Sequence, residues 1–157
     1  MDLQFDSSVI FCSDLQLQRE FYETFLNQEV EMDLGLCLIF KNKFSLWQLT
    51  DEFPISKELG YTYEHIGNRN LEMCFKTENF EDAVEKVLLS DLRILHNVEE
   101  EKWGQYTIRF YDPEGNLVEI GESMNCFVKR MHNSGMDDKQ IAEKTGLKAK
   151  HIADIVS

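Results

Sequence analysis

The first half of the chain shows two patterns of apolar and polar residues, one typical of strands and one typical of a helix. Residues 8–12 form an apolar, β-branched run that is typical of a strand. Apolar side chains then recur at helical spacing over residues 15–26, behind Ser13 or Asp14, either of which can cap a helix. Two further apolar runs are separated by a short polar turn. The pattern therefore predicts a strand, a helix and then strands at residues 36–40 and 44–49.

The same order begins again after residue 70. The two strand–helix units are related by an offset of about 64 residues, from Asp14 to Glu78. The last two predicted strands are joined by Asp-Pro-Glu-Gly at residues 112–115, in which Pro fixes φ and Gly accepts a left-handed conformation. The predicted elements are a strand at 71–76, a helix at 79–89, and strands at 92–95, 106–111 and 116–120.

Residues 50–70, between the two halves, show no apolar period. They contain Pro54, two glycines and many charged residues, so we interpret them as a long connection. His65 lies in this stretch. We interpret it as a solvated loop residue, because a histidine binds a metal only where other ligands converge on the same point.

The last quarter of the chain is helical in pattern. Asp137 followed by Gln140 is a capping-box start, and Gly146 separates that helix from a second one at residues 148–156. The spacing resembles a helix-turn-helix, but it also suits a structural cap or a dimer contact, and these interpretations stay open. A DNA-recognition helix would present Lys148, Lys150, His151 and Asp154.

Charge divides the chain near residue 121. The 157 residues carry a formal net charge of −13. Residues 1–121 hold 10 basic and 24 acidic side chains, a net of −14, whereas residues 122–157 hold 6 and 5, a net of +1. The sequence therefore predicts a domain at 1–121 and a helical extension at 122–157. Such acidity argues against nucleic-acid binding by the whole chain, because that affinity rests on cationic contacts.

Cysteine spacing and hydropathy bear on the compartment. No apolar run approaches the length of about 20 residues that spans a bilayer, and the start of the chain lacks a signal-peptide pattern, so we expect a cytoplasmic protein. The four cysteines include no C-x-x-C pair. Because Cys12, Cys37 and Cys74 lie inside apolar runs, we expect reduced thiols that act as small hydrophobic residues.

Two segments resemble a known superfamily. The start VIFCSDLQLQREFYETFLNQEV and the later stretch YTIRFYDPEGNLVEIGE resemble the glyoxalase, bleomycin-resistance and extradiol-dioxygenase proteins, also called the vicinal oxygen chelate superfamily. The D-P-x-G-N-L-x-E motif is the most specific part, and the resemblance covers roughly residues 3–122. It implies an α+β fold of two βαβββ modules, at about 3–50 and 71–121, whose strands curl into a cup. It also implies a small-molecule ligand in that cup, often a divalent metal, and a homodimer.

The resemblance assigns four positions to the metal ligands of the superfamily. Carried over by position, they fall at Ser7, Gln48, Glu72 and Glu119. Only Glu119 matches the usual ligand type, since serine and glutamine bind divalent transition metals weakly. Two implications stay open. The cup lacks a complete metal site, or Glu72 and Glu119 hold Mg²⁺, Mn²⁺, Ni²⁺ or Zn²⁺ with help from Gln48 and water.

Strand alternation places further polar residues in the cup. A three-residue hairpin loop puts Arg109 opposite Glu119, whereas a loop of two or four residues puts Ile108 there. The resemblance favours Arg109, with Thr107 on the same side. In a functional interpretation Arg109 holds an anionic group and a carboxylate acts as base or ligand. In the alternative, Arg109 forms an ion pair with Glu119 or Glu72 and fills the cup.

Two tryptophans and an acidic run complete the candidates. Trp103 could stack on a planar ligand at the rim of the cup, and Trp47 should point away from Gln48 and pack under a helix. We interpret residues 99–101, three glutamates, as a solvated face. Three functions follow as hypotheses: small-molecule binding; a metal-dependent lyase, isomerase or dioxygenase; and a ligand-sensing regulator whose tail contacts DNA or protein.

Overall fold

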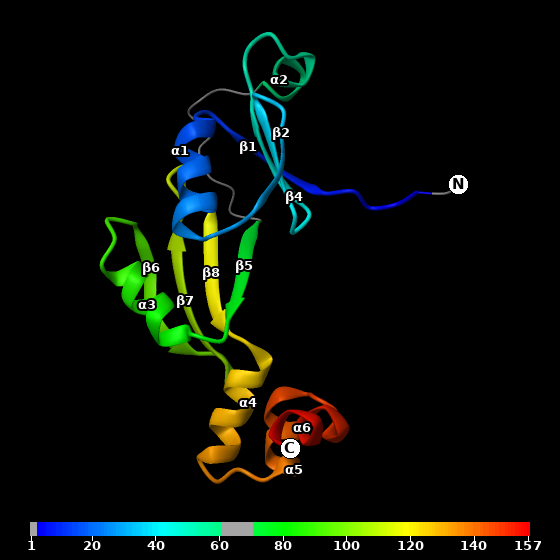
Figure 1. The fold of residues 1–157 in the computed structure, drawn as a ribbon, viewed down its shortest axis with the longest axis vertical. Coiled ribbons are helices and arrows are strands. Elements are labelled where there is room, and N and C mark those ends of the chain that lie inside the picture. The colour runs from blue at the N-terminus through cyan, green and yellow to red at the C-terminus, as the bar shows by residue number, and fades with distance from the viewer. Residues whose placement is uncertain (1–2, 61–70) are drawn as a thin grey trace. The chain divides into compact units, whose positions relative to one another are not determined.

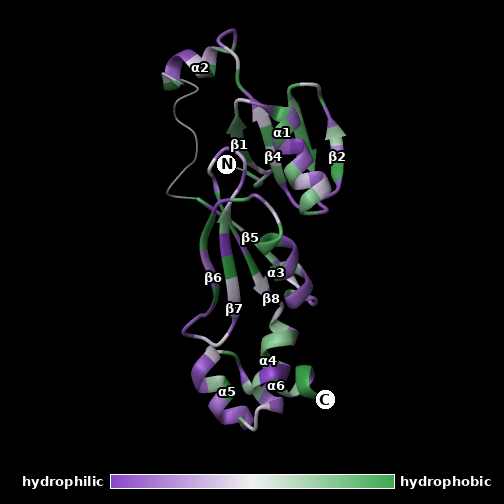
Figure 2. Ribbon diagram, turned by 90° about the vertical axis from the view of Figure 1, so that its left-hand side faces the viewer, coloured by the Kyte–Doolittle hydropathy of each residue, from purple (hydrophilic) through white to green (hydrophobic). Residues whose placement is uncertain are grey.

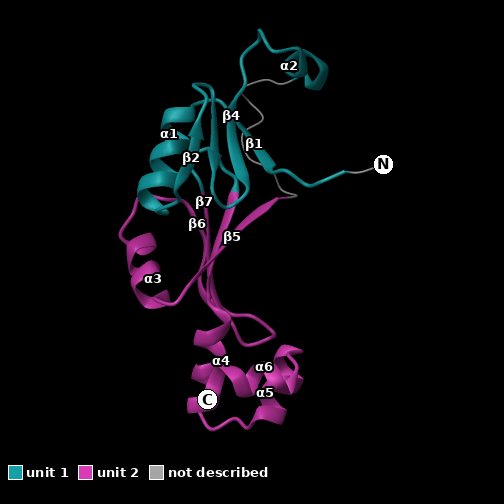
Figure 3. Ribbon diagram, turned by 45° about the vertical axis from the view of Figure 1, so that its right-hand side comes forward, with its two compact units in different colours: residues 1–68, 112–116 teal, residues 69–111, 117–157 magenta. Residues whose placement is uncertain are grey.

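The chain forms two compact units (Figures 1 and 3). The computed structural model describes residues 3–60 and 71–157, so His65 lies outside the described residues. Unit 1 comprises residues 1–68 with 112–116, and unit 2 comprises residues 69–111 with 117–157. No described helix is both long enough and apolar enough to cross a membrane.

Unit 1 contains a four-stranded mixed sheet in the order β1-β4-β3-β2, with β1 and β4 parallel. The predicted strands and helix form. The sequence pattern missed two elements: β2, whose residues are mostly exposed, and α2, where Pro54 occupies the first helical turn and does not break a helix. The elements are β1 (Ser8–Cys12), α1 (Leu15–Arg19), the π-helix η1 (Glu20–Phe25), β2 (Val30–Asp33), β3 (Cys37–Phe40), β4 (Phe44–Gln48) and α2 (Pro54–Leu59).

Unit 2 repeats this topology. Its sheet has the order β5-β8-β7-β6, with β5 and β8 parallel, so the prediction of two βαβββ modules is confirmed. Within the described residues the strands form two separate four-stranded sheets, neither of them closed. The elements are β5 (Glu72–Thr77), α3 (Phe80–Leu88), β6 (Ile94–Glu100), β7 (Tyr106–Tyr111) and β8 (Leu117–Glu122).

The sheet of unit 2 has two different faces. Ile108 and Phe110 of β7 lie with Val118 and Ile120 of β8 on the face that α3 covers, and all four are buried. In Figure 2, hydrophobic and hydrophilic segments alternate along β7, because successive side chains of a strand point to opposite faces. Thr107 and Arg109 of β7 and Glu119 of β8 therefore lie on the other face, where the functional candidates are found.

The C-terminal helices belong to unit 2 and share a core of their own. They are α4 (Met124–Asn133), α5 (Asp138–Thr145) and α6 (Ala149–Val156). Their buried side chains are Phe127, Val128, Met131, Ile141 and Ile152. The predicted capping box of Asp137 and Gln140 is confirmed, and so is the turn at Gly146, whose φ is +74°. The extension is thus a three-helix cluster.

Arg130 holds α4 against the end of the sheet. Its Nη2 donates to the Gly104 carbonyl at 2.6 Å and to the Glu122 carboxylate at 2.7 Å, and its guanidinium lies 3.7 Å from the centre of the Tyr106 ring. Lys144 of α5 adds a contact to Glu100 at 2.5 Å. The three helices are therefore held together by their own apolar core and are joined to the sheet of unit 2 by specific polar contacts.

Candidate functional site

Arg109 and Glu119 lie directly opposite each other in the β7–β8 hairpin. The predicted three-residue loop is therefore confirmed, and the register that would place Ile108 opposite Glu119 is wrong. Thr107 lies two residues before Arg109 and points to the same side of the sheet. We call this side, opposite to the one that α3 covers, the Arg109 face.

Three carboxylates surround the Arg109 guanidinium, one on each nitrogen. Its Nε donates to Glu72 at 2.6 Å, its Nη1 donates to Glu101 at 2.6 Å, and its Nη2 donates to Glu119. Thr107 bridges the group, because its hydroxyl accepts from Nη1 at 3.3 Å and donates to Glu101 at 3.2 Å. Both ion pairs of the structural alternative, Arg109–Glu119 and Arg109–Glu72, are present. We call these five residues the Arg109 cluster.

The cluster is half-buried and carries excess negative charge. The side chain of Arg109 is 19% exposed, that of Glu119 11%, and that of Glu72 31%. One guanidinium faces three carboxylates, so the cluster has a net charge of −2 when all are ionised. A guanidinium engaged in this way binds an external anion only by giving up a carboxylate, whereas the outer carboxylate oxygens still accept hydrogen bonds.

The pKa values of the cluster report this arrangement. Burial raises the pKa of Glu119, the Arg109 charge lowers it, and the neighbouring Glu72 and Glu101 raise it, so that it lies above its usual value. Burial lowers the pKa of Arg109, but the hydrogen bonds to Glu72 and Glu101 raise it more. The hydrogen bond from Arg109 lowers the pKa of Glu101. The guanidinium is therefore a permanent cation, and the Glu119 carboxyl protonates more readily than that of an ordinary glutamate.

Sequence reasoning missed three members of the Arg109 face. Glu101, interpreted as part of a solvated run, has a side chain that is only 19% exposed, and it is an ion-pair partner of Arg109. His96 lies beside Arg109 in the β6–β7 pairing, with its Nε2 at 3.2 Å from Nη1. Cys74 is exposed, so its assignment as a small core residue is wrong. The period of two from Glu72 to Cys74 could have indicated this.

The Cys74 thiol is not poised as a nucleophile. Burial, followed by the charges of Glu119 and Glu72, raises its pKa to about 11. Thiolates are the reactive form of cysteine, and a raised pKa keeps this side chain protonated at neutral pH. Among the described residues all four cysteines are free thiols, as expected, and Cys12 is fully buried.

The internal repeat relates the first strands of the two units. The helix N-caps Asp14 and Asn79 correspond, which gives an offset of 65 residues, one more than the sequence suggested. That offset relates Ser7 to Glu72, in agreement with the positions carried over from the resemblance. Ser7 is half-buried, and its hydroxyl lies 3.3 Å from that of Ser45.

The last strands correspond differently from the sequence interpretation. Phe44 pairs with Ser8 of β1, and Val118 pairs with Met73 of β5, the residue that the offset of 65 relates to Ser8. Phe44 therefore corresponds to Val118, and the residues that follow them, Ser45 and Glu119, correspond to each other. The carried-over position of Gln48 is therefore wrong by three residues. Gln48 instead lies on the helix side of its sheet, where its Oε1 accepts from the Leu15 backbone N–H at 3.0 Å and caps the start of α1.

A divalent metal does not fit this donor set. In unit 1 the corresponding positions are two serine hydroxyls, Ser7 and Ser45, which are poor ligands. In unit 2 the two carboxylates, Glu72 and Glu119, are both hydrogen-bonded to a permanent cation. Across residues 3–60 and 71–157, no three His, Cys, Asp or Glu side chains come together in a way that could hold a metal ion. Gln48, the third predicted ligand, is a helix cap.

The two tryptophans take different roles. Trp47 lies on the side of its sheet away from α1 and from Gln48, as predicted, and its ring centre is 5.8 Å from that of Phe11 and 5.3 Å from that of Phe53, the N-cap residue of α2. Trp103 lies on the connection between β6 and β7, is 41% exposed, and donates its indole N–H to Gln105 at 2.9 Å. Its stacking on a ligand stays a prediction.

The Asp-Pro-Glu-Gly-Asn segment acts as a structural clasp within unit 1. The buried Glu114 carboxylate accepts from the Ser13 N–H at 2.8 Å, the Ser13 hydroxyl at 2.7 Å and the Asp14 N–H at 2.7 Å. Asp112 accepts from the Tyr22 hydroxyl at 3.0 Å and from the Asn116 N–H at 2.8 Å. The most specific sequence motif thus holds the start of the first helix.

Known proteins share the fold and part of the sequence of this chain. Residues 5–125 match the family model of the glyoxalase-like domain, while none of the curated protein sequences matches the chain. A protein of unknown function from Agrobacterium tumefaciens str. C58 is 25% identical, with a TM-score of 0.67 over 79% of this chain and 97% of that one.

Two other solved structures share the fold at lower identity. Lactoylglutathione lyase from Agrobacterium tumefaciens is 20% identical, with a TM-score of 0.55 over 74% of this chain and 91% of that one. A glyoxalase/bleomycin resistance protein/dioxygenase family enzyme from Burkholderia phytofirmans PsJN is 12% identical, with a TM-score of 0.61 over 78% of this chain and 100% of that one. Because the family model covers most of the chain and both modules have the expected topology, this chain belongs to the glyoxalase-like domain family of the vicinal oxygen chelate superfamily.

Proposed function

We propose that this chain binds a small organic molecule on its Arg109 face without a resident divalent metal, and that the ligand carries a positive charge or several hydrogen-bond donors. The observation that carries the proposal is the arrangement of three carboxylates around one guanidinium. Arg109 supplies the positive charge that a metal would otherwise bring to these carboxylates. The outer carboxylate oxygens remain as acceptors for a ligand.

The sign of the charge decides between ligand classes. Sequence reasoning assigned Arg109 to an anionic group, but each guanidinium nitrogen donates to a carboxylate of the protein. An anion would have to displace one of these carboxylates and would approach the remaining two, which costs electrostatic energy at this burial. A cationic or donor-rich ligand instead relieves the excess charge of −2.

Metal titration tests the first part of the proposal. Isothermal titration calorimetry with Mn²⁺, Ni²⁺ and Zn²⁺ should detect no saturable binding to the unmodified protein. Arg109→Ala should gain binding of Mn²⁺, because the freed carboxylates are hard oxygen ligands. Arg109→Ala combined with Glu119→Gln is the matched control and should lose that gain. Micromolar metal binding by the unmodified protein that Glu119→Ala abolishes would overturn the proposal.

A compound series tests the second part. Thermal shift with benzylamine and agmatine should raise the melting temperature, and benzoate should not. The shift should be smaller in Glu119→Gln than in the unmodified protein, because the substitution keeps the size of the side chain and removes its charge. Stabilisation by benzoate alone would instead support an anion bound to Arg109 and would contradict the proposed ligand class. The homodimer implied by the superfamily stays a prediction that size-exclusion chromatography with light scattering can check.

A further inference from the structure

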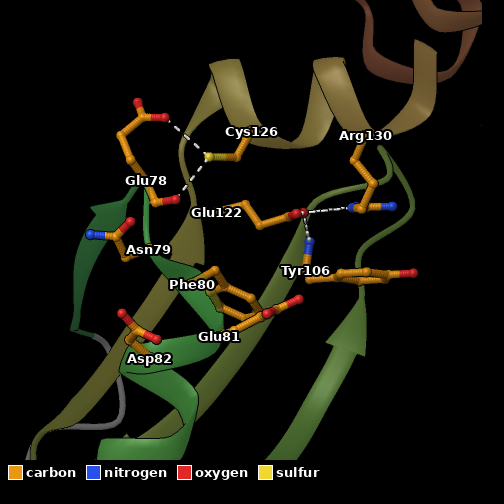
Figure 4. Close-up of a pocket in the computed structure, with 9 residues that line it drawn as sticks. All are labelled: Glu78, Asn79, Phe80, Glu81, Asp82, Tyr106, Glu122, Cys126 and Arg130. Atoms are coloured by element: carbon orange, nitrogen blue, oxygen red, sulfur yellow. Dashed lines mark hydrogen bonds and ion pairs between the residues drawn. The ribbon is translucent and has the colours of Figure 1, made fainter. Parts of the chain in front are cut away.

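A second pocket lies in unit 2, on the face of the sheet that α3 covers. It has a volume of about 310 Å³ and is lined by the start of α3, the start of β7, the end of β8, and α4 (Figure 4). This volume is at the lower end of the range for small-molecule sites, about 300–1,000 Å³. Tyr106 and Glu122 form part of its wall and point away from the Arg109 face. It is therefore separate from the site proposed above.

Negative charge dominates the lining of this pocket. Four carboxylates, Glu78, Glu81, Asp82 and Glu122, face one cation, Arg130. The Arg130 charge is already engaged, because its Nε and Nη2 donate to the Glu122 carboxylate at 2.9 and 2.7 Å. Glu81 and Asp82 also complement the dipole of α3 at its first turn, but Glu78 precedes the helix. The carboxylates of the lining thus outnumber its one cation, so the pocket carries excess negative charge.

An apolar groove continues from the pocket along α3. Its volume is about 470 Å³, and it shares Phe80, Glu81 and Tyr106 with the pocket. The rest of its lining is Glu85 and four aliphatic residues, Val84, Leu88, Leu89 and Val98. Leu88 is 48% exposed and Val98 is 41% exposed, although both are large hydrophobic residues. The two cavities adjoin at their shared lining, and we call them together the amphiphilic channel, which is acidic at the α4 end and mainly apolar along α3.

We propose that this channel binds an amphiphilic organic cation, with its ammonium group beside Glu78, Glu81 and Asp82 and its alkyl or aryl chain in the groove along α3. Charge complementarity selects the head group, since an ammonium offers up to three donors to carboxylates that have no second cation nearby in the pocket lining. The Phe80 and Tyr106 rings lie at the junction of the two parts, where they offer apolar surface to the methylene or aryl groups that follow the cation.

The C-terminal extension gives this site its closed end. Cys126 and Arg130 of α4 line the pocket, and both lie beyond residue 125, where the match to the glyoxalase-like domain ends. Contacts of Arg130 with the Gly104 carbonyl and with Glu122 hold that wall in place. The Cys126 thiol donates to the Glu78 carboxylate at 3.1 Å and so orients one of the proposed acceptors. The extension therefore completes a ligand site and does more than cap the domain.

Calorimetric titration with n-alkylamines tests the proposal on the full chain. The affinity should rise about two- to fourfold for each methylene group from butylamine to octylamine, because each buried methylene adds hydrophobic transfer energy. Octanoate, which matches the chain length and reverses the charge, should not bind. Binding of octanoate at least as tightly as octylamine, or an affinity for alkylamines that does not depend on chain length, would overturn the proposal.

Variants locate the site and separate it from the Arg109 face. The triple change Glu78→Gln, Glu81→Gln and Asp82→Asn should weaken octylamine binding about tenfold or more, because charge-assisted hydrogen bonds are lost. The control removes three exposed carboxylates of unit 1, with Glu20→Gln, Glu31→Gln and Asp51→Asn, and should leave the affinity within about twofold. Equal weakening in both triple variants would reduce the effect to net charge and refute the site.

Two single variants complete the design. Leu88→Gln in the groove should flatten the dependence on chain length while butylamine still binds, since Leu88 is half-exposed and its replacement perturbs the core little. Glu119→Gln on the Arg109 face should leave octylamine binding in the channel unchanged, even though it reduces the benzylamine effect described above. Loss of octylamine binding in Glu119→Gln would place the amine on the Arg109 face and refute the second site.

Discussion

Replacing Arg109 by methionine removes the only cation that the Arg109 cluster contains and keeps a side chain of similar length. Three carboxylates then face one another, with exposed side-chain fractions of 11%, 19% and 31% for Glu119, Glu101 and Glu72. Breaking a buried ion pair by removing one partner costs about 3–5 kcal/mol. Because solvent reaches these carboxylates in part, we expect the free energy of unfolding of unit 2 to fall by about 2–4 kcal/mol at pH 7.

Urea denaturation followed by tryptophan fluorescence measures this loss. The chain has two tryptophans, so Trp47→Phe leaves Trp103 as a reporter of unit 2. The reporter is useful because Trp103 is 41% exposed and donates to Gln105 in the same unit. Far-UV circular dichroism reports the helices and strands of both units, so it should give the same midpoint only if the two units unfold in one step.

Two comparisons separate charge from packing. Arg109→Met should cost less than about 1 kcal/mol when Glu72, Glu101 and Glu119 are already glutamine, because no anion is left unpaired. The loss in the single variant should also shrink as the pH falls and the carboxylates protonate. If Arg109→Met costs the same in both backgrounds and at both pH values, the residue acts through its packing and the electrostatic interpretation is wrong.

Three further variants test other parts of the structure. Glu114→Ala should destabilise unit 1 by about 2–3 kcal/mol, because four hydrogen bonds from Ser13 and Asp14 are lost, and fluorescence of Trp47 in a Trp103→Phe background should report it; a loss equal to that of the exposed Glu20→Ala would contradict this clasp. Gly104→Ala should cost about 1–3 kcal/mol more than Gly135→Ala, since both positions have a positive φ but only the former places a Cβ 2.8 Å from Met131; equal thermal unfolding would exclude the clash. The raised pKa of Glu119 means that the folded state holds the proton of this carboxyl more tightly than the unfolded state does, so the stability that it contributes falls as the pH rises from 4.5 through its folded pKa. The stability of Glu119→Gln relative to wild type should therefore rise over that pH range. The opposite slope would refute the sign of the shift.

Alternation and turn chemistry account for what could be predicted of the Arg109 cluster. A period of two relates Thr107 to Arg109 and Leu117 to Glu119, and the turn between the strands sets their register. These are local relations within one hairpin, so the sequence contains them. Glu72 was assigned to the site only through the resemblance. Its ion pair with Arg109 belonged to the structural alternative, in which Arg109 fills the cup, and not to the functional interpretation.

Glu101 and His96 could not be assigned in the same way. Their approach to Arg109 depends on β6 lying beside β7 with two register shifts, after Ile94 and after His96. An irregular strand reverses the faces of the residues that follow, so counting along the sequence fails there. The acidic run at 99–101 therefore resembled a solvated surface, although its last member is an ion-pair partner of the central guanidinium.

The sequence by itself determined the helical extension and the excess of acid in the first 121 residues, which follow from local periodicity, capping and composition. The two βαβββ modules and the choice of Arg109 over Ile108 as the partner of Glu119 came from the family resemblance. Only the tertiary structure decided that Ser45, not Gln48, corresponds to Glu119, that one guanidinium collects three carboxylates, and that α4 closes a pocket behind the sheet. These depend on which strands and helices become neighbours, and long-range packing sets that in ways that spacing along the chain does not encode.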